Sequence, residues 1–223
     1  NMMRKDRWSQ HEIAEIAFQA ERLHFGISGG WQDQYAAVFG GFNFIEFGMD
    51  QNVIHPIRLN KEIQMELEES LVLCSTGTSH DSGNIHKNQK ETMSSELIKI
   101  QVGKNVDLAY KTRNLLLRGR LNEFGKCLDS AWNLKRNFSE MISNDRIDSI
   151  YDGALKNGAI GGKLLGAGGG GFFIFYVPPF KKFNLIDYLV SQDLEIQPFR
   201  FESDGLQYWA SRENKTTKLF KEI

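Results

Sequence analysis

Apolar and polar residues recur at helical spacing in several stretches of the chain. The first stretch follows Ser9-Gln10-His11-Glu12, a capping box whose serine and glutamate side chains can bond to backbone amides at the start of a helix. Gly26 ends this predicted helix, and its apolar positions are Ile13, Ile16, Ala17, Ala20 and Leu23. The same spacing predicts further helices over residues 106–117, 121–138, 147–155 and 183–191.

Other stretches carry the short apolar runs or the strict alternation that are typical of β-strands. We predict strands over residues 42–47, 53–59, 63–67, 71–76, 172–177, 196–201 and 205–209. Pro56 interrupts the second of these, which favours an edge strand or a bulge. Because strands and helices are mixed along the chain, the pattern predicts an α+β fold with an antiparallel or mixed sheet.

Glycine residues cluster directly before the apolar run 172–177. Such a cluster costs backbone entropy, so we expect it to serve left-handed backbone or a close approach to a ligand or another strand. Gly166, Gly168 and Gly171 match Gly-x-Gly-x-x-Gly, but the dinucleotide motif of that form opens a helix, whereas a strand is predicted here. No Gly-Lys-Ser/Thr closes the cluster, so it is not a P-loop. We predict a loop that leads into a central strand, with Lys163 just upstream.

Composition narrows the class of function. A net charge of −1 over 223 residues gives no electrostatic basis for binding nucleic acid or an anionic membrane, and the apolar runs are far too short to span a bilayer. Cys74 and Cys127 lie far apart, so we expect two thiols in or near the core and a reduced, cytoplasmic setting. No secretory signal precedes the first helix, and because the chain starts at Asn1 rather than Met we expect it to be part of something longer.

Two segments carry candidate chemistry. In the first, Asp33 lies between two Gly-Gly pairs and is flanked by glutamines and aromatic residues. If the segment is a short helix, Trp31, Tyr35 and Val38 share one face, and Asp33 and Gln34 are displaced from it. The carboxylate is either a solvated or capping group or a site residue, and spacing alone leaves both open.

The second segment is the polar stretch that follows the strand predicted over residues 71–76. Its hydroxyl, amide and imidazole groups can both donate and accept, as recognition of a sugar requires, although an exposed loop gives the same composition. The sugar-side candidates are Ser82, Asn84 and His86. With few histidines and cysteines nearby in sequence, we predict no metal site in the protein itself.

Taken together, these motifs resemble the GHMP small-molecule kinases. The run Lys163–Gly171 is similar to the C-terminal glycine-rich motif of that family, and Gln32-Asp33-Gln34 is similar to the segment that carries its catalytic aspartate. The resemblance spans nearly the whole chain. It implies the remainder of an N-terminal α+β domain of the ribosomal protein S5 type over residues 1–62, and a ferredoxin-like α+β domain over residues 63–223.

The resemblance also implies an activity. ATP, with Mg²⁺, would phosphorylate the anomeric hydroxyl of a heptose 7-phosphate, supplying nucleotide-activated heptose for surface polysaccharide. Asp33 would accept the proton of that hydroxyl or orient it. The sugar-side residues would be Gly30, Trp31, Gln34 and Lys163 with the three residues named above, and the glycine loop would be Gly166, Ala167, Gly168, Gly169, Gly170 and Gly171.

The chain departs from the family pattern at one point. The loop of the Pro-x-x-x-Gly-Leu-Ser-Ser type that wraps the ATP phosphates is absent, so we predict that this polypeptide alone neither binds ATP tightly nor turns over. Two alternatives stay open: a non-catalytic sugar-binding relative that acts as a sensor or partner-binding module, and a kinase for another sugar such as fucose. Exposed apolar surface would also favour association, for example as a homodimer.

Overall fold

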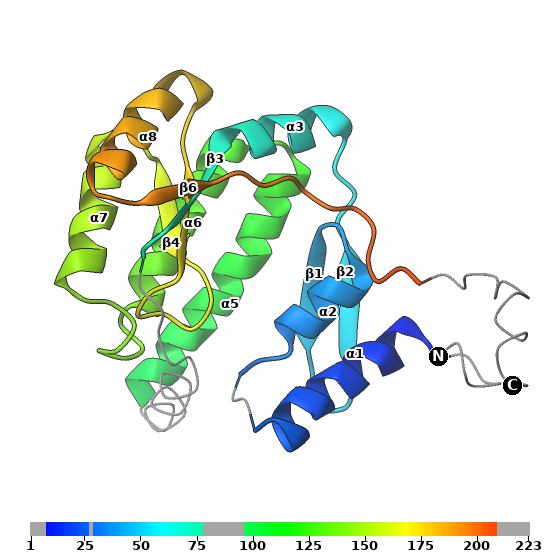
Figure 1. The fold of residues 1–223 in the computed structure, drawn as a ribbon. Helices are drawn as coiled ribbons and strands as arrows, with labels where there is room; N and C mark the ends of the chain where they lie inside the picture. The colour runs from blue at the N-terminus through cyan, green and yellow to red at the C-terminus, as the bar shows by residue number, and fades with distance from the viewer. Residues whose placement is uncertain (1–7, 27–28, 78–95, 209–223) are drawn as a thin grey trace, which may run out of the picture.

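A computed structural model describes residues 8–26, 29–77 and 96–208 (Figure 1). The N-terminal part consists of helix α1 (Gln10–Gln19), a π-helical turn (Ala20–His24), helix α2 (Gln32–Phe39) and an antiparallel hairpin of β1 (Asn43–Phe47) and β2 (Asn52–Pro56). The predicted capping box is confirmed, because the Glu12 amide donates to the Ser9 hydroxyl at 3.2 Å and the Ser9 amide donates to the Glu12 carboxylate at 2.6 Å. Gly26 follows the helical turn with a φ of 65°.

The rest of the described chain forms a four-stranded antiparallel sheet with helices packed on it. The sheet order is β4-β5-β3-β6, so β5, which follows the glycine loop, is a central strand as predicted. The strands are β3 (Leu71–Ser75), β4 (Gly161–Leu164), β5 (Phe172–Tyr176) and β6 (Glu195–Gln197). The helices are α3 (Lys61–Ser70), α5 (Glu96–Leu117), α6 (Leu121–Lys135), α7 (Asp145–Lys156), a 3₁₀ turn (Pro179–Lys181) and α8 (Lys182–Ser191).

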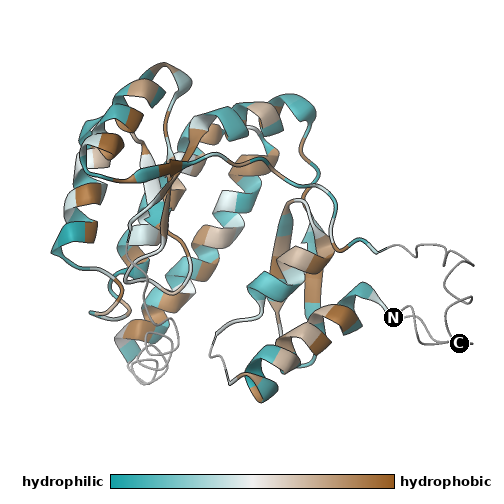
Figure 2. Ribbon diagram, in the orientation of Figure 1, coloured by the Kyte–Doolittle hydropathy of each residue, from teal (hydrophilic) through white to brown (hydrophobic). Residues whose placement is uncertain are grey.

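The main core lies between the sheet and the helices. Phe173 and Phe175 of β5 are fully buried and contact Tyr151 of α7, while Leu185 and Leu189 of α8 belong to the same cluster. Figure 2 shows hydrophobic and hydrophilic positions alternating along the helices, as the sequence pattern predicts. Both cysteines are buried and reduced, as predicted.

The N-terminal hairpin packs against α5, which stands between the hairpin and the sheet in Figure 1. The Phe44 ring of β1 lies 4.9 Å from the Tyr110 ring of α5, and the Phe42 ring lies 4.7 Å from that of Phe201 near the C-terminal end. The C-terminal segment thus returns to the N-terminal part. The predicted division into residues 1–62 and 63–223 stays a prediction, and it falls in the first turn of α3.

The strand predicted over residues 63–67 is wrong, because these residues belong to α3. The Asn60 side chain caps this helix by accepting a hydrogen bond from the Ile63 amide at 3.0 Å. Leu67 is buried and Ile63 packs against the same cluster one turn away, whereas Met65 is exposed. The alternating apolar residues therefore lie on and beside the apolar face of a helix, and the glutamates between them favour helix.

Two further strand predictions need correction. The strand predicted over 196–201 is reduced to Glu195–Gln197, and residues 205–208 of the last predicted strand are irregular. The Leu206 amide donates instead to the carbonyl of Val38 at the end of α2, and such a bond to a helix terminus starts no ladder. Strand β4 was not predicted, since its glycines carry no strand signal. In the described part of the chain, no helix has the length and apolar character needed to cross a bilayer.

Candidate active site

Asp33 lies in the first turn of α2 with its side chain exposed. The residue that precedes this helix, Trp31, provides no side-chain hydrogen bond to the first helical amides, which leaves those donors to face solvent or a ligand. Gly30, Trp31 and Gln32 line a pocket of about 310 Å³ together with Phe47, Gly48 and Asn52 from the β1–β2 hairpin. Two of the predicted sugar-side residues, Gly30 and Trp31, thus help to form this pocket, and Asp33 directly follows Gln32 of its lining in the first turn of α2.

A buried polar contact fixes α2 on the side that faces α1 and the hairpin. Tyr35 is 1% exposed. Its hydroxyl donates to the Glu15 carboxylate of α1 and accepts from the Asn52 side-chain amide at 3.0 Å. Burial, followed by the Glu15 carboxylate, raises the pKa of Tyr35 above its ordinary value. The start of α2, with its aspartate, is thus held by both α1 and the hairpin.

Gln34 differs from the prediction. It is 5% exposed rather than displaced from the buried face, because the helix turns it toward the core beside Tyr35 and Val38. Within the described residues, neither the amide oxygen nor the amide nitrogen of Gln34 has a hydrogen-bond partner. A buried amide without partners costs on the order of 1–3 kcal/mol.

The glycine loop joins β4 to β5 and is fastened at both ends. The Leu165 amide donates to the carbonyl of Phe172 at 2.8 Å, which closes the hairpin. At the far end, the Thr76 amide donates to the Gly171 carbonyl at 2.8 Å, and the Thr76 hydroxyl accepts from the Gly171 amide at 3.0 Å. Thr76 thereby ties the loop to the end of β3.

The middle of the loop rests on residues 139–144. The Gly169 amide donates to the Ile142 carbonyl at 2.8 Å, and a Cβ on Gly168 would lie 2.9 Å from the Ile142 Cα. Gly166 and Gly171 also have positive φ, but open space surrounds them, unlike Gly168. Of the predicted loop, then, residues 167–170 are buried, Gly166 is exposed, and Gly171 is half-buried with its backbone bonded to Thr76.

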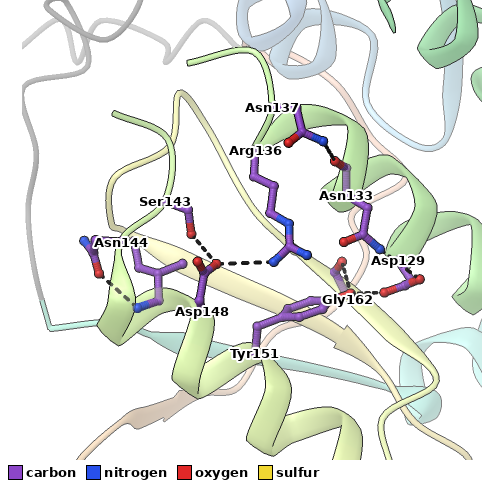
Figure 3. A network of polar contacts seen from close by, with 10 residues as sticks. Asp129, Asn133, Arg136, Asn137, Ser143, Asn144, Asp148, Tyr151 and Gly162 are labelled. Carbon is purple, nitrogen blue, oxygen red and sulfur yellow. Dashed lines mark hydrogen bonds and ion pairs between the residues drawn. The ribbon is translucent and has the colours of Figure 1, made fainter. Parts of the chain in front are cut away.

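Figure 3 shows the polar network that supports this arrangement. Asp148 of α7 accepts from the Ser143 hydroxyl at 2.6 Å and pairs with Arg136 at 3.4 Å, which fixes the segment under the loop. Tyr151 donates to Asp129 of α6 at 2.8 Å and lies 3.3 Å from the Gly162 carbonyl of β4. Burial and the Asp129 carboxylate raise the pKa of Tyr151. The network joins α6, α7 and β4.

Two lysines lie beside the glycine loop. Lys135, at the end of α6, donates to the carbonyls of Leu164 (3.3 Å) and Gly166. Burial, followed by the positive charge of Lys163, lowers the pKa of Lys135 to about 8. Burial also lowers the pKa of Lys163, which lines a second pocket, between β1, α5 and α6. The Lys163 side chain is half-buried.

The other predicted site residues stand as follows. Ser82, Asn84 and His86 lie outside the described residues. The pocket that Gly30, Trp31 and Gln32 line and the pocket that Lys163 lines share no lining residue, and the roles expected of Asp33 and of the glycine loop stay predictions. Sequence reasoning missed Lys135, Thr76 and Asp148, because each supports the loop from a distant part of the chain. The only sequence signal was their position at the end of a predicted helix or strand, or in the first turn of a helix.

With this geometry established, comparison with known families is informative. The model described as "GHMP kinases N terminal domain" matches residues 1–41, and that described as "GHMP kinases C terminal" matches residues 112–192. Together they match more than half of the chain, and they include Asp33 and the glycine loop. The chain belongs to the GHMP kinase family.

Its relatives include heptose-phosphate kinases. The chain is 39% identical over 201 residues to D-glycero-alpha-D-manno-heptose 7-phosphate kinase of Campylobacter jejuni, which covers 90% of this chain and 59% of the relative. A solved D-glycero-D-manno-heptose 1-phosphate kinase of Bacteroides thetaiotaomicron is 30% identical, with a TM-score of 0.65, over 92% of this chain and 57% of that one. A bifunctional fucokinase/GDP-fucose pyrophosphorylase of Arabidopsis thaliana is 27% identical over 78% of this chain and 17% of its own length. The chain thus spans less than two thirds of each.

Proposed function

We propose that this chain belongs to an ATP-dependent sugar kinase that phosphorylates the anomeric hydroxyl of D-glycero-D-manno-heptose 7-phosphate. The observation that carries the proposal is the 39% identity to the Campylobacter relative of that name, over a stretch that contains both Asp33 and the glycine loop. The geometry is compatible, because Asp33 is exposed in the first turn of a helix without a side-chain cap, next in sequence to a residue that lines a small pocket.

In the proposed reaction, a bond forms between the anomeric oxygen and the γ-phosphorus of ATP, and the bond from that phosphorus to the β–γ bridging oxygen breaks. ADP leaves, and the hydroxyl proton passes to the Asp33 carboxylate. Because phosphoryl transfer depends mostly on positioning and on stabilising charge, one well-placed carboxylate suffices as the base or orienting group. Gly30 and Trp31 would contact the sugar from the pocket wall, and the open ends of the glycine loop would let backbone approach the phosphates.

The residues present also fit a metal that arrives with the nucleotide. In the described part of the chain, no three histidine, cysteine, aspartate or glutamate side chains gather as metal ligands. Mg²⁺ commonly takes one or two protein carboxylates and completes its shell with phosphates and water, so Asp33 could contribute to such a shell. When bound, the ion would neutralise charge on the transferring phosphoryl group.

The proposal is tested by measuring ADP release with a panel of sugars. The panel holds heptose 7-phosphate, the same heptose without phosphate, and fucose, and the enzyme is the product of the gene's full reading frame with ATP and Mg²⁺. We expect kcat/KM for heptose 7-phosphate to exceed that for fucose by about 100-fold or more, the range that contacts to a charged group can supply. Preference for fucose would establish the sister kinase, and sugar binding without ADP release would establish the non-catalytic relative.

The 223-residue chain serves as the comparison in the same assay. We expect it to release no ADP above background, because it holds no loop of the family's phosphate-wrapping type. An ADP release by this chain that is lost on Asp33→Asn would contradict this expectation while supporting the role of Asp33.

A further inference from the structure

A pocket of about 310 Å³ lies where the β1–β2 hairpin meets α5 and α6. Its lining residues on α5 recur every three or four positions, which places them on one stripe of that helix. The lining is Asn43, Phe44, Ile57, Asn105, Leu108, Ala109, Thr112, Arg113, Leu116, Cys127, Leu128, Ala131 and Lys163. The pocket is thus apolar at its base, with a few polar groups, the composition typical of a small-molecule site.

The charges of this lining are unbalanced. Lys163 and Arg113 are the charged residues among those that line the pocket, and no carboxylate is among them. In the described residues, no ion pair or hydrogen bond is found for the Lys163 ammonium, which burial has removed from most of its water. An ammonium group in that position is costly unless an anion compensates it.

Strand geometry explains why Lys163 lies there. Along β4, Leu164 is fully buried in the core, so the neighbouring Lys163 side chain points to the opposite face, toward α6. The pKa of the adjacent Lys135 is lowered by burial and, second, by the positive charge of Lys163, so Lys135 adds positive potential beside Lys163 instead of pairing with it. Lys135 is itself held by the Leu164 and Gly166 carbonyls, which leaves Lys163 as the ammonium that faces the pocket.

Arg113 is held at the pocket wall by aromatic rings. Its guanidinium lies 4.6 Å from the centroid of the Phe44 ring and 5.1 Å from that of Tyr110. The nearby carboxylate of Glu46 accepts from the Tyr110 hydroxyl and lies 2.6 Å from the His55 ring nitrogen, and these contacts, with a smaller contribution from the Arg113 charge, lower the pKa of Glu46. The Arg113 Nε and Nη2 groups donate to the Asn114 Oδ1 at 3.2 Å, so the guanidinium is held in place and Nη1 is the group that can donate to an oxyanion.

From these contacts we propose that this pocket binds the phosphate group of a small phosphate monoester, with Lys163 and Arg113 as its charged contacts. The apolar base and the Asn43, Asn105 and Thr112 side chains would accommodate the organic part. The phosphate would come either from the sugar-phosphate substrate or from a separate phosphate compound. The use of heptose 7-phosphate as a probe rests on the proposed function, whereas the binding site itself does not require catalysis.

The test is calorimetric titration of the 223-residue chain without nucleotide, using three probes: heptose 7-phosphate, the same heptose without phosphate, and inorganic phosphate. We expect a phosphate-bearing probe to bind, and Lys163→Met to weaken its binding by about tenfold or more, as loss of a charge-assisted contact does. Lys163→Arg should retain most of the affinity. Lys156→Met removes an exposed lysine of α7 and should leave the affinity unchanged. Thermal unfolding of each variant verifies that it is folded.

The probes also separate the two sources of the phosphate. Tighter binding of heptose 7-phosphate than of inorganic phosphate assigns the site to the substrate, and the reverse order assigns it to a free phosphate. Equal binding of the phosphate-free heptose, an unchanged affinity in folded Lys163→Met, or no binding by the chain would each overturn the proposal. Failure of the proposed function would be seen differently, as an absence of ADP release with every sugar of the panel.

Discussion

Gly166 and Gly168 show how two glycines of one loop are required for different reasons. Both have positive φ, 67° and 123° respectively, which side chains adopt at a cost. Only Gly168 is also crowded, because a Cβ there would lie 2.9 Å from the Ile142 backbone and 3.0 Å from its Cγ2, whereas nothing lies within 4 Å at Gly166.

Alanine substitution should therefore separate strain from crowding. Gly166→Ala should lower the free energy of unfolding by about 1–2 kcal/mol, the cost of a left-handed residue. Gly168→Ala should cost more, about 2–5 kcal/mol, because about 1–3 kcal/mol of steric displacement is added to the backbone cost. Urea unfolding monitored by fluorescence measures both, and an equal loss in the two variants would contradict this assignment.

The site residues were predictable where a local pattern marked them. The two glycine pairs and two glutamines around Asp33 mark it as a candidate; it lies in the first turn of a helix, and its role stays a prediction. The prediction for Gln34 is wrong, because it assumed that α2 buries a single face, the one formed by Trp31, Tyr35 and Val38. The hairpin and α1 together cover more of the helix than that face. Burial by distant elements has no counterpart in local spacing, which is why spacing displaced Gln34 from the buried face.

At the scale of elements, capping residues indicate the type of secondary structure better than alternation of apolar residues does. Ser9, Asn60 and Asn144 each accept a hydrogen bond from an amide of the first helical turn. Attention to Asn60 would have predicted α3 correctly, since an N-cap before four glutamates outweighs three alternating apolar residues. The β4 strand was beyond local prediction, because Gly161 and Gly162 are there for close packing: a Cβ on Gly161 would lie 2.1 Å from the Gly125 carbonyl oxygen of α6.

The network around α7 makes a prediction at this scale. Asp148→Ala removes both the Ser143 hydrogen bond and the Arg136 ion pair that fix residues 139–144 under the glycine loop. We expect faster hydrogen exchange of the Gly169 amide, whose acceptor is the Ile142 carbonyl, together with a loss of about 1–2 kcal/mol in stability. Asp148→Asn keeps an acceptor for the Ser143 hydroxyl, so its exchange rate and stability should lie between those of the unaltered chain and of Asp148→Ala. Unchanged exchange at Gly169 in Asp148→Ala would show that the network does not support the loop.

For the whole molecule, the fold class and the central position of β5 followed from the sequence, because a short apolar run between turn residues needs cover on both faces. The contacts that join the two parts did not. The C-terminal segment returns to α2 through two backbone hydrogen bonds: the Gly41 amide donates to the Glu202 carbonyl, and the Leu206 amide donates to the Val38 carbonyl. No periodicity in the sequence predicts them. Association as a homodimer likewise stays a prediction.

Lys135 gives the stability of the molecule a pH dependence. Its pKa is about 8 in the folded chain against an ordinary value of 10.5, so between these values the unfolded chain binds more protons. Stability from this group therefore rises as the pH increases through that window. Relative to Lys135→Met, the wild-type chain should gain on the order of 1 kcal/mol in free energy of unfolding between pH 7.5 and 10. A constant difference across this range, measured by urea unfolding, would contradict the lowered pKa.

The central claim, that Asp33 performs the phosphoryl transfer of a GHMP kinase, is tested most directly by the kcat of Asp33→Asn. The measurement uses the product of the full reading frame with saturating ATP, Mg²⁺ and heptose 7-phosphate, and Asp187→Asn on the exposed side of α8 as the control. We expect kcat to fall by about 100-fold or more in Asp33→Asn, because a general base is lost, while the affinity for the sugar and the kcat of the control stay unchanged. A kcat in Asp33→Asn equal to that of the unaltered enzyme would contradict the central claim.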